Sequence, residues 1–158
     1  MNIRIILTTL LISAAIVGVN NPTFAQHKTA SSEQGAIQEI HRLVNEHRIK
    51  KGLKPLEMND DINKEALKHS KNMASGRVGF GHGGFKDRSN KLMNAIKGAN
   101  ASGENVEYTT GNAAEVVDNW LHSPNHKKNI EGNFTLTGIG MARASDGQVY
   151  YTQIFIKN

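Results

Sequence analysis

The residues that could carry out chemistry lie in two segments of the chain. Segment 103–129 contains Glu104 in a glycine turn and His126 after a proline, and segment 79–84 places His82 among glycines. We expect the two segments to lie side by side in space. An imidazole held by a carboxylate can accept a proton, bind a ligand or coordinate a metal ion. The same side chains can also form a satisfied polar cluster, so a reactive site, a binding cleft and a purely structural cluster are all open.

A nucleophile for covalent catalysis is harder to find. Ser123 lies near His122 and His126, but Pro124 follows it directly and the surrounding sequence is not that of a nucleophile elbow. Ser123 is better explained as part of a helix stop. The chain has no cysteine, which excludes thiol chemistry, iron–sulfur clusters and zinc sites built on cysteine.

The first half of the chain predicts two amphipathic helices. The segment 31–34, Ser-Ser-Glu-Gln, has the form of a capping box and begins a helix that ends near Lys51. Asn59 caps a second helix, which stops at Gly76. His69 falls on the apolar face of this second helix. It is therefore predicted to be a core-edge residue with a hydrogen-bond partner rather than a ligand.

The second half predicts helices followed by strands. A weak helix is expected at 87–99, a short strand at 104–108, and the clearest helix of the chain from the cap Asn112 to Pro124. Trp120 lies on the apolar stripe of that helix and is predicted to be a core anchor. Two strand-like segments joined by a turn complete the chain, at 136–142 and 148–156. This order predicts an α+β domain with helices packed on a sheet and a C-terminal β-hairpin.

The first 25 of the 158 residues have the pattern of a secretory signal peptide. A short basic start containing Arg4 precedes an apolar run, and small residues before Ala25 suggest cleavage after Ala25. The mature chain, 26–158, would then be secreted or periplasmic, with no transmembrane segment. Residues 26–33 read as a mobile polar leader. Without its signal peptide, a domain of this size can bury enough apolar surface to fold without disulfides, and we expect a monomer.

The full chain has 19 basic and 14 acidic residues, and Arg4 is the only charged residue of the signal peptide. The mature chain is therefore mildly basic, with a net charge of about +4. The lysines are spread along the chain and no nucleic-acid-binding motif is present. The lysines at 50–51, 68, 71 and 127–128 could form a weakly basic surface near anionic cell-wall polymer or lipid headgroups. A solvated face that keeps the protein soluble is the favoured reading.

Several motifs occur in an order that resembles a known family. They are Asn45-Glu46-His47-Arg48, Gly81-His82, Gly103-Glu104-Asn105-Val106, Trp120-Leu121-His122-Ser123-Pro124-Asn125-His126 and Tyr151-Thr152-Gln153-Ile154-Phe155. Together with the second helix, they resemble the CAP superfamily of cysteine-rich secretory, antigen 5 and pathogenesis-related 1 proteins. The chain is most similar to its cysteine-free bacterial branch of SCP-like extracellular proteins. The resemblance covers nearly all of 34–156 and identifies 34–158 as a single CAP domain.

The resemblance implies a three-layer α-β-α sandwich with a small antiparallel sheet and a cleft. In many members two histidines and two glutamates line this cleft and hold a divalent cation. His82 and Glu104 match one residue of each kind. The second glutamate is replaced here by Ser123 and the second histidine by Tyr150, so half of the tetrad is absent. His126 is the replacement that the bacterial branch suggests.

The resemblance therefore implies a cleft lined by His82, Glu104, His126 and Tyr150. His82, Glu104 and His126 could form a weak, open site for a divalent cation such as zinc. The alternative, which we place slightly ahead, is that Glu104 accepts backbone and histidine N–H bonds and clamps the loops together. Tyr150 and Tyr151 alternate on a strand, so one should face the cleft and the other the core or solvent.

Three functions follow from these expectations. The first is a secreted, non-catalytic binding module for a small molecule, lipid, peptide or cell-wall fragment. The second is a peptidase-like hydrolase in which His82 or His126 acts as general base with Glu104, or in which a metal activates water. The third is a structural or interaction domain of the cell surface. The incomplete tetrad in an otherwise complete set of motifs favours the binding module over an enzyme.

Overall fold

The computed structural model describes residues 22–158 of the chain, with side chains from Ser32 onward. Residues 1–21 of the predicted signal peptide lie outside the described residues. The elements, in chain order, are α1 (Pro22–Lys50), β1 (Glu57–Met58), α2 (Asp60–Ala74), α3 (Phe85–Ala95), β2 (Ala101–Thr109), α4 (Ala113–His122), α5 (Pro124–Ile130), β3 (Leu136–Arg143) and β4 (Val149–Lys157).

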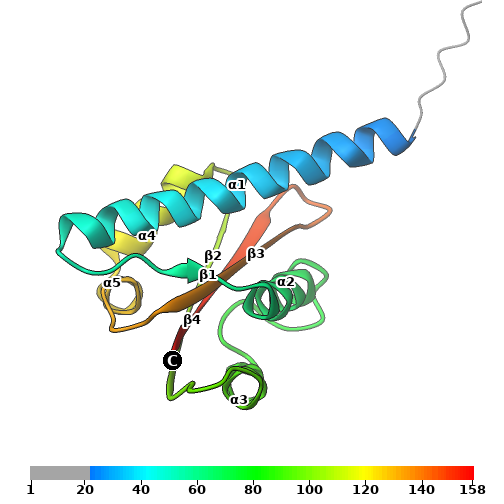
Figure 1. Ribbon diagram of the computed structural model, residues 1–158. Coiled ribbons are helices and arrows are strands. Elements are labelled where there is room, and N and C mark those ends of the chain that lie inside the picture. The colour runs from blue at the N-terminus through cyan, green and yellow to red at the C-terminus, as the bar shows by residue number, and fades with distance from the viewer. Residues whose placement is uncertain (1–21) are drawn as a thin grey trace, which may run out of the picture.

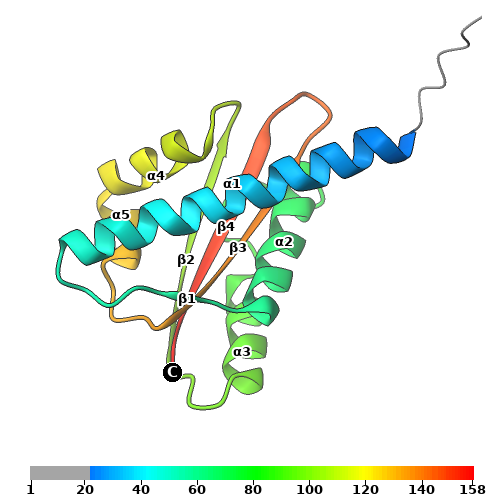
Figure 2. The ribbon, with the colours of Figure 1, turned by 45° about the horizontal axis from the view of Figure 1, so that its top comes forward.

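Four strands form a single sheet in the order β1-β3-β4-β2. The hairpin pairs β3 with β4 in antiparallel register, and β2 pairs antiparallel with the other side of β4, with Glu104 opposite Ile154 and Tyr108 opposite Tyr150. The two-residue strand β1 pairs parallel with β3. Figure 2 shows the three long strands side by side.

Helices cover both faces of this sheet. In Figures 1 and 2, α1, α4 and α5 lie on one face, and α2 and α3 lie on the other. The predicted α+β fold, an α-β-α sandwich with a C-terminal hairpin, is confirmed. The sheet differs from the prediction in one respect: it is mixed rather than purely antiparallel, because β1 adds a short parallel edge.

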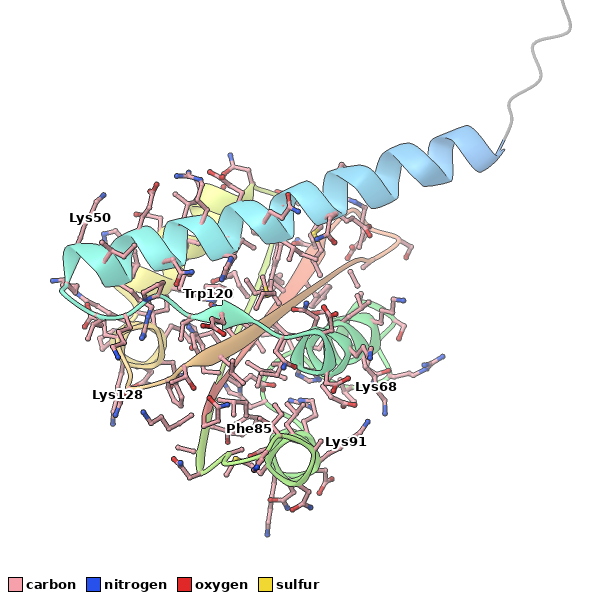
Figure 3. All side chains as sticks on the ribbon, in the orientation of Figure 1. Lys50, Lys68, Phe85, Lys91, Trp120 and Lys128 are labelled. Carbon is pink, nitrogen blue, oxygen red and sulfur yellow. The ribbon has the colours of Figure 1, made fainter. Side chains whose placement is uncertain are left out.

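Each face of the sheet has its own core. On the α1 and α4 side, Trp120 is fully buried, as predicted, and its indole Nε1–H donates to the carbonyl of Val106 at 3.3 Å. Figure 3 shows Trp120 in the interior, between α1 and the sheet. On the α2 and α3 side, Ile62 and Leu92 pack against Ile154 and Ile156. Burying apolar side chains on both faces is the main force that holds the three layers together.

Helix α2 lies unusually close to β3. A Cβ atom added to Gly140 would lie 2.1 Å from the backbone nitrogen of Leu67, and one added to Gly138 would lie 2.4 Å from that of Asn63. The Ser70 hydroxyl donates across this contact to the carbonyl of Gly140 at 3.0 Å. Glycine in the strand therefore lets the helix backbone rest directly on the sheet.

Helix α1 begins earlier than the capping box at 31–34 predicts. It starts at Pro22, and proline is well suited to the first helical position because its fixed φ matches the helix and its missing N–H needs no partner there. The predicted leader, 26–33, therefore lies on α1. Its mobility and cleavage after Ala25 stay predictions. Within residues 22–158, no helix is both long and apolar enough to span a membrane.

Two short elements were not predicted. Pro124 ends α4, as expected, but it also opens α5 at its first turn. Glu57 and Met58 form β1, between the first two predicted helices, where no strand was predicted. Neither element is long enough to carry a hydrophobic period of its own, so both depend on the sheet and helices around them.

Candidate functional site

Glu104 is the centre of the polar cluster that the sequence singled out. It lies on β2, and its side chain is only 1% exposed. Arg88 on α3 donates Nε to Oε2 at 3.0 Å and Nη2 to both oxygens at 2.9 Å. His82 donates Nδ1–H to Oε1 at 3.0 Å. A buried carboxylate is thus neutralised by a guanidinium that grips both of its oxygens, the geometry in which charged hydrogen bonds are strongest.

The surrounding chain fixes this carboxylate in place. Gly103 precedes Glu104, and a Cβ there would lie 2.9 Å from Asn129 Oδ1, so the Asn129 side chain would have to move to admit one. The Asn129 amide donates to the carbonyl of Glu104 at 3.0 Å. On the other side, Arg88 Nη1 donates to the carbonyl of Gly83 at 2.8 Å, and so joins the glycine loop to α3.

His82 is the exposed member of the cluster. Its side chain remains 52% exposed, compared with 11% for Arg88. The ring is oriented by Glu104 through Nδ1, which leaves its outer side facing solvent. Of the predicted cleft residues, His82 and Glu104 are therefore brought together by a direct hydrogen bond.

His126 lies on α5 and is not bonded to this pair. Its backbone carbonyl accepts from the Asn105 amide at 3.0 Å, whereas its buried Nδ1 has no hydrogen-bond partner among residues 22–158. Burial lowers the pKa of His126, and the positive charge that His82 can carry lowers it further. The two rings are thus close enough to interact through space, but Glu104 serves only His82.

Tyr150 takes part in an aromatic cluster that was not predicted. Its ring stacks on Tyr108 at 5.8 Å between centroids, and Phe80 meets the Tyr108 ring edge-on at 4.7 Å. Phe80 and Tyr108 are 50% and 46% exposed. Tyr151 points the opposite way and is buried in the core, as strand alternation predicts. We call Phe80, Tyr108 and Tyr150 the aromatic platform.

The predicted metal site does not fit the structure. Among residues 22–158, no three His, Cys, Asp or Glu side chains come together in a way that could hold a metal ion. The reason lies in Arg88, whose guanidinium bonds both oxygens of Glu104. A cation at that carboxylate would have to displace a guanidinium of the same charge sign. His82, Glu104 and His126 are therefore not assembled as the expected three-ligand site.

A Ser–His pair is not formed either. Ser123 joins α4 to α5, and its backbone N–H bonds the carbonyl of Asn119. His122 turns back along its own helix to the carbonyl of Asp118 at 2.8 Å. Within the described part of the chain, no hydrogen bond links Ser123 to a histidine.

Three further polar residues have structural roles, and for His69 this was predicted above. His69 is buried and bonds the carbonyl of Gly81 through Nε2 at 2.8 Å, and burial lowers its pKa. Asn45 binds both the N–H and the carbonyl of Leu56. Arg48 is 2% exposed and donates to four backbone carbonyls, those of Lys54, Ile130, Gly132 and Phe134.

Sequence reasoning missed Arg88, Phe80 and Tyr108. Arg88 had one usable signal: it is one of few arginines in a chain whose basic residues are mostly lysines, and arginine is the residue that suits a bidentate carboxylate contact. Phe80 and Tyr108 come from a loop and a strand 28 positions apart, and the pairing of β2 with β4 places Tyr108 opposite Tyr150.

Comparisons with known proteins agree with this fold. A profile of the cysteine-rich secretory protein family, CAP, matches residues 41–155. The uncharacterized membrane protein YlbC of Bacillus subtilis is 32% identical over 145 residues, which are 88% of this chain and 38% of that protein. The uncharacterized protein YkwD of the same species is 31% identical over 143 residues, or 87% of this chain and 51% of that protein. The chain thus spans about half or less of these curated relatives.

Solved structures show the same architecture. An extracellular protein of Bacillus anthracis that contains an SCP domain superposes with a TM-score of 0.68 at 29% identity, over 89% of this chain and 45% of that one. An outer surface protein of Borrelia burgdorferi superposes with a TM-score of 0.69 at 21% identity, over 78% of this chain and 93% of that one, a likeness of fold alone. With the profile match over most of its length, the chain belongs to the cysteine-rich secretory protein (CAP) family.

Proposed function

We propose that this protein is a secreted, non-catalytic binding module of the cell envelope, and that it takes a saccharide fragment of the cell wall on the aromatic platform beside His82. The observation that carries the proposal is the exposure of two large aromatic side chains, Phe80 and Tyr108, stacked with Tyr150 at one end of the sheet. Exposed aromatic clusters of this kind mark binding surfaces rather than core.

The chemistry of the platform favours a sugar over a lipid. A pyranose ring presents an apolar C–H face that can lie on an aromatic ring, while its hydroxyls reach polar groups at the edge. The half-exposed His82 ring, two residues from Phe80, supplies such a group. A lipid tail needs an enclosed apolar cavity, whereas Phe80 and Tyr108 lie open to solvent.

The state of Glu104 weighs against Glu104 itself acting as a general base; the hydrolase alternative would instead use His82, which Glu104 orients. A general base must be free to accept a proton from a substrate or water. Both oxygens of Glu104 are occupied by Arg88, and one of them also accepts from His82. The cluster is therefore better suited to hold the glycine loop, and with it Phe80 and His82, in a fixed position next to Tyr108.

Isothermal titration of chain 26–158 with a muropeptide, with its disaccharide and with phospholipid vesicles tests the proposal. We expect the disaccharide to bind and Tyr108→Ala to weaken its binding by about tenfold, since one stacking contact contributes roughly 1–1.5 kcal/mol. Ile49→Ala is the matched control, because Ile49 is also a large exposed apolar residue, at 60%, but lies on α1.

The other functions give different outcomes. Binding to vesicles but not to sugar would replace the saccharide by a lipid. Cleavage of the muropeptide that is lost in His82→Ala would establish the peptidase-like hydrolase. An equal loss in Tyr108→Ala and Ile49→Ala would show that the platform has no special role.

A further inference from the structure

A second candidate site lies at the opposite end of β2 from the platform. There, a groove of about 790 Å³ lies between α5 and the last residues of β4. Its walls include three lysines, Lys127, Lys128 and Lys157, and the ring of Phe134. A volume of this order is in the range that accommodates ligands. We call it the lysine groove.

The positive charge of the lysine groove is not compensated by the protein. Among the ion pairs of residues 22–158, none involves Lys127, Lys128 or Lys157. The one acidic residue in the wall, Glu131, instead bonds His47 Nε2 at 2.8 Å. That hydrogen bond is the main cause of the lowered pKa of Glu131, with a further contribution from Lys127. The groove therefore carries a net positive charge.

The groove is also longer than a single anion. A second hollow of about 640 Å³ shares the segment 131–134 and Lys157 with the first, and extends to Lys54 near the end of α1. Lys157 Nζ donates to Asn133 Oδ1 at 3.3 Å, which draws the ammonium toward this shared segment. Lysines from α5, β4 and the α1–β1 connection thus line two adjoining hollows.

We propose that the lysine groove binds a linear polyanion whose repeating units are polyols joined by phosphodiesters. Lysine is a compact point charge with three donors and a flexible stem, so several lysines can follow the singly charged, rotatable phosphate groups of a flexible phosphodiester chain. The only arginine in the lining, Arg48, is already bonded to four carbonyls. Amide side chains such as Asn133 are available for polyol hydroxyls.

The shape of the site favours a chain over a membrane surface. The lysines line an open hollow between α5 and the end of β4, which a flexible polymer can follow more closely than a flat bilayer. Figure 3 shows that Lys128 lies beside α5, on the opposite side of the molecule from Lys68 and Lys91. Lys68 and Lys91 are thus not part of a basic face shared with the groove, which limits the area that could lie flat on anionic lipid.

The test compares two variants of chain 26–158 that carry the same net charge. The first is Lys127→Gln/Lys128→Gln/Lys157→Gln, which removes the groove lysines. The second is Lys68→Gln/Lys71→Gln/Lys86→Gln, which removes three exposed lysines from α2 and α3. Binding of a glycerol phosphate oligomer is measured by fluorescence anisotropy at low salt, and thermal unfolding confirms that both variants fold.

We expect the groove variant to weaken binding by about tenfold or more, since each exposed charge contact contributes roughly two- to fivefold. The control variant should remain within about twofold of the wild type, and added salt should weaken wild-type binding more than that of the groove variant. Poly-glutamate of equal charge should bind more weakly than the oligomer.

Four results would overturn the proposal. They are no binding of the oligomer, an equal loss in both variants, poly-glutamate binding as tightly as the oligomer, and anionic vesicles binding more tightly with the same dependence on the groove lysines. Full competition by inorganic phosphate at the same phosphate concentration would also overturn it, by showing a single-anion site. None of these results bears on Tyr108, so the saccharide proposal stands or falls separately.

Discussion

At the scale of single residues, buried charge is concentrated on two arginines with different tasks. Arg88 neutralises the buried carboxylate of Glu104, and Arg48 has no carboxylate and donates only to backbone carbonyls. Burial lowers the pKa of Arg48. Each arginine joins segments far apart in sequence, α3 to β2 in one case and α1 to the loop after α5 in the other. Both act as connectors rather than as ligands for a substrate.

The pair of Arg88 and Glu104 gives the first prediction. Removing one partner leaves the other charge buried without compensation, which typically costs about 3–5 kcal/mol. We expect Arg88→Met and Glu104→Gln each to lower the free energy of unfolding by about 3 kcal/mol in urea titrations. The double variant should lose less than the sum, because it leaves no unpaired charge.

His82→Ala is the control for this cycle, since the His82 side chain is half exposed and its contact with Glu104 should contribute no more than about 1 kcal/mol. If Arg88→Met were no less stable than His82→Ala, the guanidinium would not be the structural partner of Glu104.

His69 gives a pH dependence. Burial lowers its pKa in the folded state, so the unfolded chain takes up a proton first as the pH falls. Stability should therefore be complete above the unfolded value of about 6.5 and decline as the pH falls through it. In His69→Gln, whose amide can still donate to the carbonyl of Gly81, urea unfolding between pH 7.5 and 5 should show a shallower decline. His122→Gln, at an exposed position, should keep the wild-type slope.

Residue-level prediction succeeded where a local rule applied. Trp120 followed the helical stripe, Tyr151 followed strand alternation, and His69 followed the apolar face of α2. The role of Arg88 was not predicted. The sequence around an arginine on a weak helix does not show whether its side chain faces solvent or reaches a neighbouring strand. The expected metal ligands failed for the same reason: Glu104 was placed correctly, but its partner was not visible.

At the scale of elements, the contact between α2 and β3 is the closest in the fold. Two glycines, Gly138 and Gly140, let the backbone of the helix contact that of the strand directly. Ser70 joins the helix to the sheet by hydrogen bonds to the carbonyl of Gly140 and to Thr152. Hydrophobic patterning describes which side chains face each other, but the distance between the layers is set by positions that have no side chain.

The second glycine gives the third prediction. Gly140→Ala would force a methyl group to within 2.1 Å of the α2 backbone, so the helix must move away from the sheet. We expect a loss of about 3 kcal/mol or more in the free energy of unfolding, at the upper end of overpacking effects. Gly83→Ala is the control: a Cβ there meets nothing within 4 Å, and stability should change by less than about 0.5 kcal/mol. Equal stability of the two variants would contradict the close contact.

The short elements could not be predicted from hydrophobic patterning. The long helices and the hairpin carried clear periods and, apart from the start of α1, were placed within a few residues. Helix α5 spans seven residues, and β1 spans two, so neither offers enough positions for a period to show. Pro124 was read only as a stop, although proline also favours the first turn of a new helix. The lysine groove depends on α5, and so it could not be predicted.

At the scale of the whole molecule, two helical layers enclose the sheet between them. The ordered motifs along the chain were sufficient to predict the sandwich, because each motif corresponds to one element and the family fixes their arrangement. The length of α1 was not foreseen. The first of its fully buried residues is Ile40, and Ala36 and Ile37 pack against the same core.

The predicted domain boundary gives the last prediction. A chain that begins at Gln34 should unfold within about 4 °C of a chain that begins at Gln26, which corresponds to less than roughly 1 kcal/mol. A chain that begins at His41 loses both Ile37 and Ile40 and should unfold at least about 10 °C lower, given the usual cost of emptying core positions. Circular dichroism melting curves distinguish these outcomes. A large loss in the Gln34 chain would move the domain boundary toward the N-terminus.

The position of β4 bears on how the protein is made. It is the last strand in the chain, yet it lies between β3 and β2 and is paired on both sides along its length. A nascent chain that has not yet delivered Val149–Lys157 lacks the strand that joins the sheet, so β2 has no neighbour to pair with. The sheet therefore cannot close until β4 has been synthesised. Such a delay would suit the export that the predicted signal peptide implies.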